Sequence, residues 1–191
     1  MNRYGKETNL KPFSRLIKQN YKSPMVGVEI GIADGNHAFG MLNTIPNLYL
    51  YLIDPFMEYF DDYKTRPDKD VQMWYENFKK NLSNSPYKEN IKFFHCSSRI
   101  AAKFIPNNLD FIYIDGNHSY EFCKSDIKLY FDKVKSGCMF GGDDYNWNGV
   151  KQAVDEFISK SGYELHTEEY SVYTSKNKEN LMHSIDWWII K

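Results

Sequence analysis

The chain has 191 residues, of which 42% are hydrophobic, so its length corresponds to about one domain with a sizeable core. Its 24 Lys and Arg residues nearly balance 25 Asp and Glu residues, giving a net charge of −1. This balance, with only four Arg among the cations, excludes a protein that coats nucleic acid by bulk positive charge.

In chain order, we expect a leading helical segment over residues 1–23, with a helix at Phe13–Gln19. Apolar runs bounded by turn residues then predict five strands, at Met25–Ile30, Leu48–Ile53, Ile91–Phe94, Asp110–Ile114 and Cys138–Phe140. Near-continuous apolar runs are typical of strands buried on both faces of a parallel sheet.

Helical spacing of apolar residues between these runs predicts helices over Val71–Leu82, Tyr120–Val134 and Val150–Ile158. Two further runs, Tyr163–Thr167 and Ile185–Ile190, lack a convincing helix between them and predict a closing antiparallel hairpin. Together these elements predict one α/β domain over residues 1–191. Its doubly wound, mostly parallel seven-stranded sheet would carry helices on both faces.

The N-terminus lacks the apolar run of a signal peptide, and no segment approaches the ~20 apolar residues of a membrane span. The three cysteines, Cys96, Cys123 and Cys138, form no CxxC pair and predict neither a disulfide framework nor a zinc cage. We therefore expect a reduced, cytoplasmic protein without a membrane partner. The sequence leaves open whether it forms a homo-oligomer.

Small or acidic residues follow every one of the five predicted parallel strands. Ligands of an open α/β sheet bind outside the carboxyl ends of its strands, so these residues are the candidates for a site. They are Gly31 to Gly35, Asp54, Ser97 and Ser98, Asp115 to His118, and Gly142 to Asp144. Turn preference alone explains any one of these groups, but five at one edge favour a binding site.

The first of these turns has GxxxG spacing at Gly31 and Gly35, and the chain contains neither GxGxxG nor GxxxxGK[ST]. A phosphate cradle is therefore disfavoured, although a plain tight turn remains an alternative. Asp54 ends the second strand, where a carboxylate can accept both hydroxyls of a ribose. Its alternative role is an Asp-Pro strand stop.

The carboxylates Asp115, Asp143 and Asp144 follow two strands expected to be neighbours, where three negative charges would repel unless a cation holds them. Oxygen ligands select Mg²⁺ or another hard divalent cation. Turn and helix-capping roles for these carboxylates are the alternative. His118 lies three residues after Asp115 and suits a general base, although a lone histidine is often structural.

Three stretches carry a resemblance to class I S-adenosylmethionine-dependent methyltransferases. The segments 28–35, 53–55 and 110–121 resemble the family's first, second and fourth motifs. With GGDDY at 141–145, the chain is similar to the small single-domain group that includes macrolide-sugar O-methyltransferases. The resemblance implies a Rossmann-like methyltransferase fold and S-adenosylmethionine as cofactor.

The same resemblance assigns roles to individual positions. Glu29, Gly31 and Gly35 would contact the methionine part of the cofactor and Asp54 its ribose, while Ser97 would lie near the adenine. Similarity to catechol-type members implies that Asp115, Asp143 and Asp144 hold Mg²⁺, with Asp115 also beside the cofactor. Asp115 and His118 would be the catalytic residues, with His118 as the base.

The expected reaction is methyl transfer to a hydroxyl of a small molecule, a saccharide or a vicinal diol, with divalent metal assistance. A metal-independent enzyme and a non-catalytic cofactor-binding module are the alternatives. A nucleic-acid partner is disfavoured by the neutral charge. The mixed stretch 55–70 is a candidate lid, with Phe56, Tyr59, Phe60 and Tyr63 available to stack on the acceptor.

Overall fold

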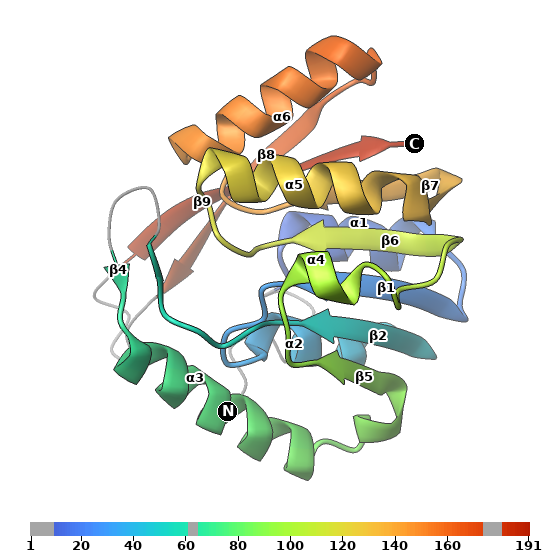
Figure 1. The fold of residues 1–191 in the computed structure, drawn as a ribbon. Coiled ribbons are helices and arrows are strands. Elements are labelled where there is room, and N and C mark those ends of the chain that lie inside the picture. Colours follow the sequence, from blue (N-terminus) through green and yellow to red (C-terminus); the bar gives the residue numbers. More distant parts are fainter. Residues whose placement is uncertain (1–9, 61–64, 174–180) are drawn as a thin grey trace.

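A seven-stranded sheet forms the centre of the computed structural model, which describes residues 10–60, 65–173 and 181–191. The strand order is β5-β2-β1-β6-β7-β9-β8 (Figure 1). The strands are β1 (Met25–Ile30), β2 (Leu48–Ile53), β5 (Ile91–Phe94), β6 (Leu109–Ile114), β7 (Val134–Gly142), β8 (His166–Tyr173) and β9 (Leu181–Ile190). The first five pair in parallel, whereas β9 runs antiparallel to both β7 and β8. The predicted mostly parallel sheet and closing antiparallel pair are confirmed.

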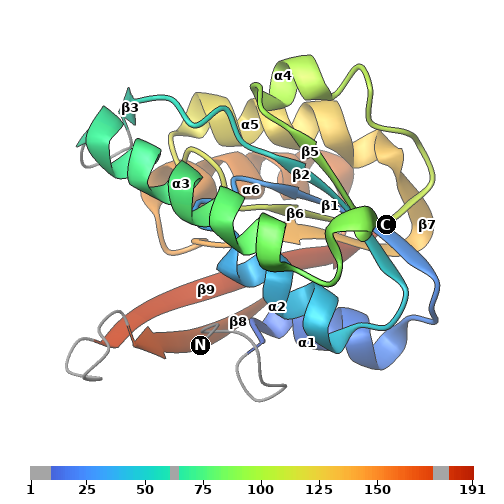
Figure 2. The same cartoon turned by 90° about the horizontal axis from the view of Figure 1, so that it is seen from below.

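Six α-helices of the described residues cover the sheet on both faces (Figure 2). They are α1 (Pro12–Asn20), α2 (Asn36–Thr44), α3 (Asp68–Asn84), α4 (Ser98–Ala101), α5 (Tyr120–Tyr130) and α6 (Asn148–Ser161). The 3₁₀ turns η2 (Lys88–Asn90) and η3 (Phe131–Lys133) precede β5 and β7. Side chains of α1, α2 and α3 form one core cluster and those of α4, α5 and α6 a second, on the opposite face. No helix in the described ranges is long and apolar enough to cross a bilayer.

The structure differs from the sequence prediction at several elements. The helix α2 has no narrow apolar stripe, because six consecutive residues from His37 to Leu42 are buried, so helical periodicity did not reveal it. The predicted helix over Tyr120–Val134 ends at Tyr130, where η3 leads into β7. The final hairpin is longer than predicted, and its first strand begins at His166 instead of Tyr163. A short antiparallel pair, β3 (Tyr59–Phe60) and β4 (Thr65–Arg66), lies inside the 55–70 stretch.

The strand order reverses between β1 and β6. The chain adds β2 and β5 on one side of β1, and it then adds β6 and β7 on the other side. Ligands of open α/β sheets bind at the carboxyl ends of the strands at such a switch point. Backbone hydrogen bonds hold the loops there in register beyond the strands. The amide of Gly31 donates to Ile53 at 2.8 Å, and that of Asp115 donates to Ile30 at 2.7 Å.

Candidate active site

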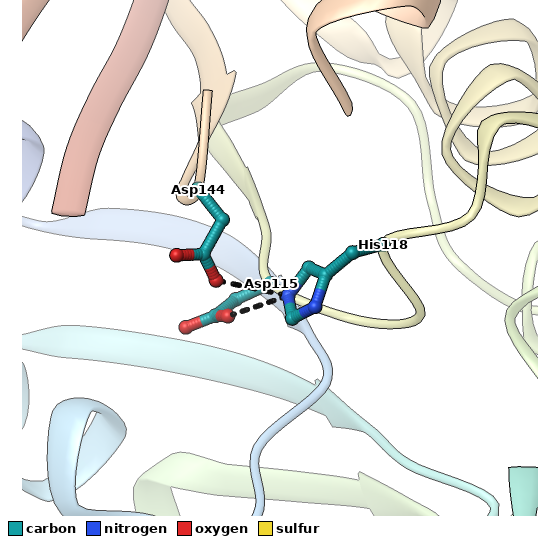
Figure 3. Close-up of side chains that lie close together, drawn as sticks. All are labelled: Asp115, His118 and Asp144. Atoms are coloured by element: carbon teal, nitrogen blue, oxygen red, sulfur yellow. Dashed lines mark ion pairs between the residues drawn. The ribbon is translucent and has the colours of Figure 1, made fainter. Parts of the chain in front are cut away.

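Three polar side chains meet at this edge of the sheet, namely Asp115, His118 and Asp144 (Figure 3). Asp115 follows β6, His118 lies in the loop before α5, and Asp144 follows β7. The Nε2 atom of His118 is 3.0 Å from Oδ2 of Asp144 and 3.8 Å from Oδ1 of Asp115. The ring of Trp147 packs on the imidazole with 4.7 Å between centroids. We call these three residues, Asp115, His118 and Asp144, the catalytic cluster, after the role that the family resemblance implies for His118.

The catalytic cluster adjoins a buried lysine, Lys11, whose backbone precedes α1. Its Nζ atom donates to Oδ2 of Asp115 and to Oδ2 of Asp143, each at 2.7 Å. Burial lowers the pKa of Lys11, but the two carboxylates outweigh burial and raise that pKa well above its ordinary value. Burial also raises the pKa of Asp115, yet Lys11 and His118 bring it well below its ordinary value. The ammonium group and the Asp115 carboxylate are therefore both charged at neutral pH.

The two oxygens of Asp143 belong to a network of hydrogen bonds beside the catalytic cluster. Its Oδ2 accepts from Lys11 and from the hydroxyl of Tyr170. Its Oδ1 accepts from the backbone amide of Asp144 and lies 2.7 Å from the Ser184 hydroxyl. The same hydroxyl is 2.7 Å from Oδ1 of Asp144, so Ser184 links the carboxylates of Asp143 and Asp144.

Asp144 is held in an unusual backbone conformation for a residue with a side chain. Its φ is 58°, in the left-handed region that Asp and Asn tolerate best. Burial, and then the charge of Asp143, raise the pKa of Asp144. The site thus contains one carboxylate held strongly ionised, Asp115, and one with raised proton affinity, Asp144, and both face Nε2 of the imidazole.

The donor set of the catalytic cluster fits a divalent cation. One ligand atom from each of its residues lies within 4.8 Å of the others, offering two carboxylate oxygens and one imidazole nitrogen, a set that divalent metal ions such as Mn²⁺ accept. The sequence predicts Asp115, Asp143 and Asp144 as the ligands. The structure instead brings Asp115 and Asp144 together with His118, whereas the oxygens of Asp143 contact Lys11, Tyr170 and Ser184.

The two glycines of the first turn are required by the protein's own packing. Gly31 has φ +81°, and a Cβ there would lie 2.0 Å from the backbone oxygen of Asp115. Gly35 has φ +78°, and its Cβ would lie 2.7 Å from the ring of Phe39. Gly31 therefore lets the first turn lie directly against the loop that carries Asp115, and Gly35 lets the same turn lie against the ring of Phe39.

Asp54, the predicted ribose ligand, is placed at the end of β2 beside the same turn. Its Oδ2 accepts from the backbone amides of Ile32 and Ala33 at 3.0 and 3.2 Å, and its Oδ1 accepts from that of Phe56 at 2.8 Å. Burial raises the pKa of Asp54, against the lowering effect of these amides. In the structure described, Asp54 braces the glycine turn.

Ser97, predicted near the adenine, directly precedes α4, and its carbonyl accepts from the amides of Ile100 and Ala101. The carbonyl of Ser98 accepts from the hydroxyl of Tyr130 on α5 at 2.7 Å. Asp126, also on α5, hydrogen-bonds to Ser98, and burial raises its pKa to about 7. The Ser97–Ser98 turn is thus anchored to α5.

Glu29, predicted to contact the cofactor, is buried at the end of β1 and belongs to a chain of three polar side chains. Its Oε1 is 3.1 Å from Nδ1 of His37, and Nε2 of His37 is 2.7 Å from the hydroxyl of Ser14. A neutral imidazole fits both contacts, donating to the carboxylate and accepting from the hydroxyl. The other oxygen, Oε2, is buried without a hydrogen-bond partner among the described residues.

His37→Phe is expected to lower the free energy of unfolding by about 3 kcal/mol, because it removes both hydrogen bonds and leaves the Glu29 carboxylate buried without them. Urea unfolding followed by circular dichroism measures this change. Ser14→Ala removes only the hydrogen bond between Ser14 and His37 and serves as the control, with an expected cost of about 1 kcal/mol. A His37→Phe cost no larger than that of Ser14→Ala would contradict the arrangement.

The stretch 55–70 divides between core and surface. Phe56 is buried, with its ring packed on Tyr75 and Phe78. It is therefore a core residue and is not available to stack on an acceptor. The side chain of Phe60 is 65% exposed, while its carbonyl accepts from Nδ2 of Asn117 at 3.0 Å, next to His118. Tyr63 lies outside the described residues.

Several residues of the site have no signal in the sequence that we found. Lys11, Tyr170 and Ser184 contact the acidic groups from elements distant in the chain, and His37 lies in a helix that periodicity did not reveal. The polar strand ends alone indicated where the site would form.

Comparisons with known proteins concern the family and the fold of the chain. A family model described as a methyltransferase domain matches residues 28–145, more than half of the chain. No curated protein sequence matches the chain. The fold is similar to a precorrin-6Y C5,15-methyltransferase from Geobacter metallireducens, with 16% identity, TM-score 0.67, and coverage of 92% of this chain and 84% of that one.

Two other solved structures share the fold. An O-methyltransferase from Streptomyces achromogenes involved in tomaymycin synthesis, in complex with S-adenosylmethionine, has 9% identity and a TM-score of 0.63, with 94% of this chain and 78% of that one covered. An rRNA methylase from Streptococcus thermophilus has 11% identity and a TM-score of 0.62, with 93% of each chain covered. One fold therefore serves carbon, oxygen and RNA methylation in these proteins.

Proposed function

This chain belongs to the methyltransferase domain family whose model matches its residues 28–145, and from that premise we propose that it methylates a hydroxyl of a small molecule. S-adenosylmethionine is the methyl donor, and the acceptor is a saccharide or a vicinal diol. The observation that carries the proposal is the catalytic cluster, where two carboxylates approach Nε2 of one imidazole at the switch point of the sheet. Because the structural neighbours differ in acceptor, the proposal rests on this cluster and not on the fold.

The chemistry asks for little besides positioning and a proton acceptor, since the sulfonium methyl is already activated. The acceptor oxygen must lie about 3 Å from that methyl, in line with the breaking C–S bond. As the new C–O bond forms, the hydroxyl proton passes to Nε2 of His118 and S-adenosylhomocysteine departs with the electron pair of the C–S bond. Asp144, 3.0 Å from Nε2, stabilises the imidazolium that results.

Metal assistance is the second element of the proposal. Asp115, Asp144 and His118 would hold a divalent cation, which would orient two neighbouring hydroxyls and lower their pKa. The same Nε2 atom cannot ligate a cation and accept a proton at once. In the metal-assisted form the hydroxyl, its pKa lowered by the cation, would lose its proton to solvent water, whereas the metal-independent form uses His118 as the base. The ammonium of Lys11, already paired with Asp115, favours the metal-independent form.

The stretch 55–70 is proposed as a cover for the acceptor. The carbonyl of Phe60 is hydrogen-bonded to Asn117, which places β3 beside the loop that carries His118. The exposed side chains of Met57 and Phe60 supply apolar surface there.

The test is a transfer assay with S-adenosylmethionine labelled in its methyl group and a panel of saccharides, vicinal diols and their singly O-methylated derivatives. We expect labelled product from at least one saccharide or diol. Excess EDTA separates the two forms, since the metal-independent form keeps its full rate, whereas the metal-assisted form loses it and regains it with Mg²⁺ or Mn²⁺. Cofactor binding by calorimetry without transfer to any hydroxyl compound would contradict the proposal and favour a non-catalytic module.

A further inference from the structure

Lys11 places a positive charge of the chain itself beside the three carboxylates of this site. Its side chain is 6% exposed, and its Nζ atom bridges Asp115 and Asp143 at 2.7 Å on each side. The rings of Tyr113 and Tyr170 flank the ammonium, with their centroids 5.1 and 6.0 Å away. Two carboxylates and two aromatic faces thus surround a cation that belongs to the chain.

Lys11 shares one carboxylate with the catalytic cluster. Oδ2 of Asp115 accepts from Lys11, while Oδ1 of the same group is the oxygen that faces His118. A cation bound by the cluster would therefore lie next to the ammonium, on the opposite oxygen of one carboxylate. Because Lys11 is buried and the carboxylates of the cluster are partly buried, salt screens this repulsion much less than it would at the surface.

The charges of the site decide what the ammonium does. Asp115, Asp143 and Asp144 would together give three negative charges, a strong site for a divalent cation. Lys11 neutralises one charge, and the oxygens of Asp143 are hydrogen-bonded to Lys11, Tyr170 and Ser184.

We propose that Lys11 is a positioning residue that lies between the carboxylates of Asp115 and Asp143 and weakens divalent-cation binding at the catalytic cluster. Its ammonium group takes the place of a bound cation there, because it holds Oδ2 of Asp115 and Oδ2 of Asp143. The inference deepens the proposed function, but it concerns affinity for a cation and does not depend on the acceptor.

The experiment is calorimetric titration of the whole chain with Mn²⁺ alone, comparing the wild type with Lys11→Met, Lys11→Gln and Lys11→Arg. Removing the charge should raise the Mn²⁺ affinity about tenfold or more, and Lys11→Arg, which keeps the charge, should bind as the wild type does. Lys11→Gln retains a donor to the carboxylates and serves if Lys11→Met fails to fold, which thermal unfolding shows.

Two further variants locate the effect. In Lys11→Met/Asp143→Asn, one positive and one negative charge are lost together, so the Mn²⁺ affinity should return to near the wild-type value. Adding Asp144→Asn to Lys11→Gln should abolish the gain, because it removes a ligand of the cluster. Folded Lys11→Gln and Lys11→Met proteins with wild-type Mn²⁺ affinity would overturn the proposal. The readout needs no methyl transfer, so this failure is distinct from failure of the proposed function.

Discussion

His118→Ala is expected to lower kcat for methyl transfer by about 10²- to 10⁴-fold, the usual contribution of a positioned proton acceptor. The imidazole is the group of the catalytic cluster that lies within reach of both carboxylates, 3.0 Å from Asp144 and 3.8 Å from Asp115. Its removal takes away either the base or a cation ligand, so both forms of the proposed mechanism lose rate. Steady-state kinetics with a saturating acceptor measure the change.

The control for this variant is His183→Ala, since His183 lies on β9 with its side chain 56% exposed and paired with Glu169. We expect it to keep the wild-type kcat. Affinity for S-adenosylmethionine, measured by calorimetry, should stay unchanged in both variants. A His118→Ala enzyme with undiminished kcat would remove the catalytic cluster from the mechanism.

Gly31→Ala is expected to destabilise the fold by about 3 kcal/mol or more, for two separable reasons. A residue with a Cβ is strained at φ +81°, at a cost of roughly 1–2 kcal/mol. The new Cβ would also lie 2.0 Å from the backbone oxygen of Asp115, so one of the two loops must move. Urea unfolding measures the stability, and transfer activity should fall as well because Asp115 moves with its loop.

Gly137→Ala separates these two causes. Gly137 has φ +77° but nothing within 4 Å of the position of its Cβ, so its substitution carries only the backbone strain. We expect Gly31→Ala to exceed Gly137→Ala by at least about 1.5 kcal/mol. Equal costs would show that the close approach of the two loops is not rigid.

The sequence was most informative where the signal is local. A strand buried on both faces needs a near-continuous apolar run, and the runs at Met25–Ile30 and Leu48–Ile53 coincide with β1 and β2. The helix α2 escaped because burial on nearly every side leaves no apolar period. The predicted closing hairpin is shorter than the observed one. From Glu168 onward the polar and apolar residues of β8 alternate only weakly, and pairing with β9 makes them part of the strand.

The sequence by itself determined the mostly parallel sheet, the antiparallel closing pair and the edge where Asp115, His118 and Asp144 gather, because each strand end carries its own polar residues. Only the tertiary structure decided their partners. Lys11 is separated from Asp115 by 104 residues and from Asp143 by 132, and a lysine before a helix is ordinarily exposed. Lys11 becomes buried only when α1 packs on the sheet. No local pattern could therefore show that its ammonium group lies between two of the three predicted metal ligands, Asp115 and Asp143.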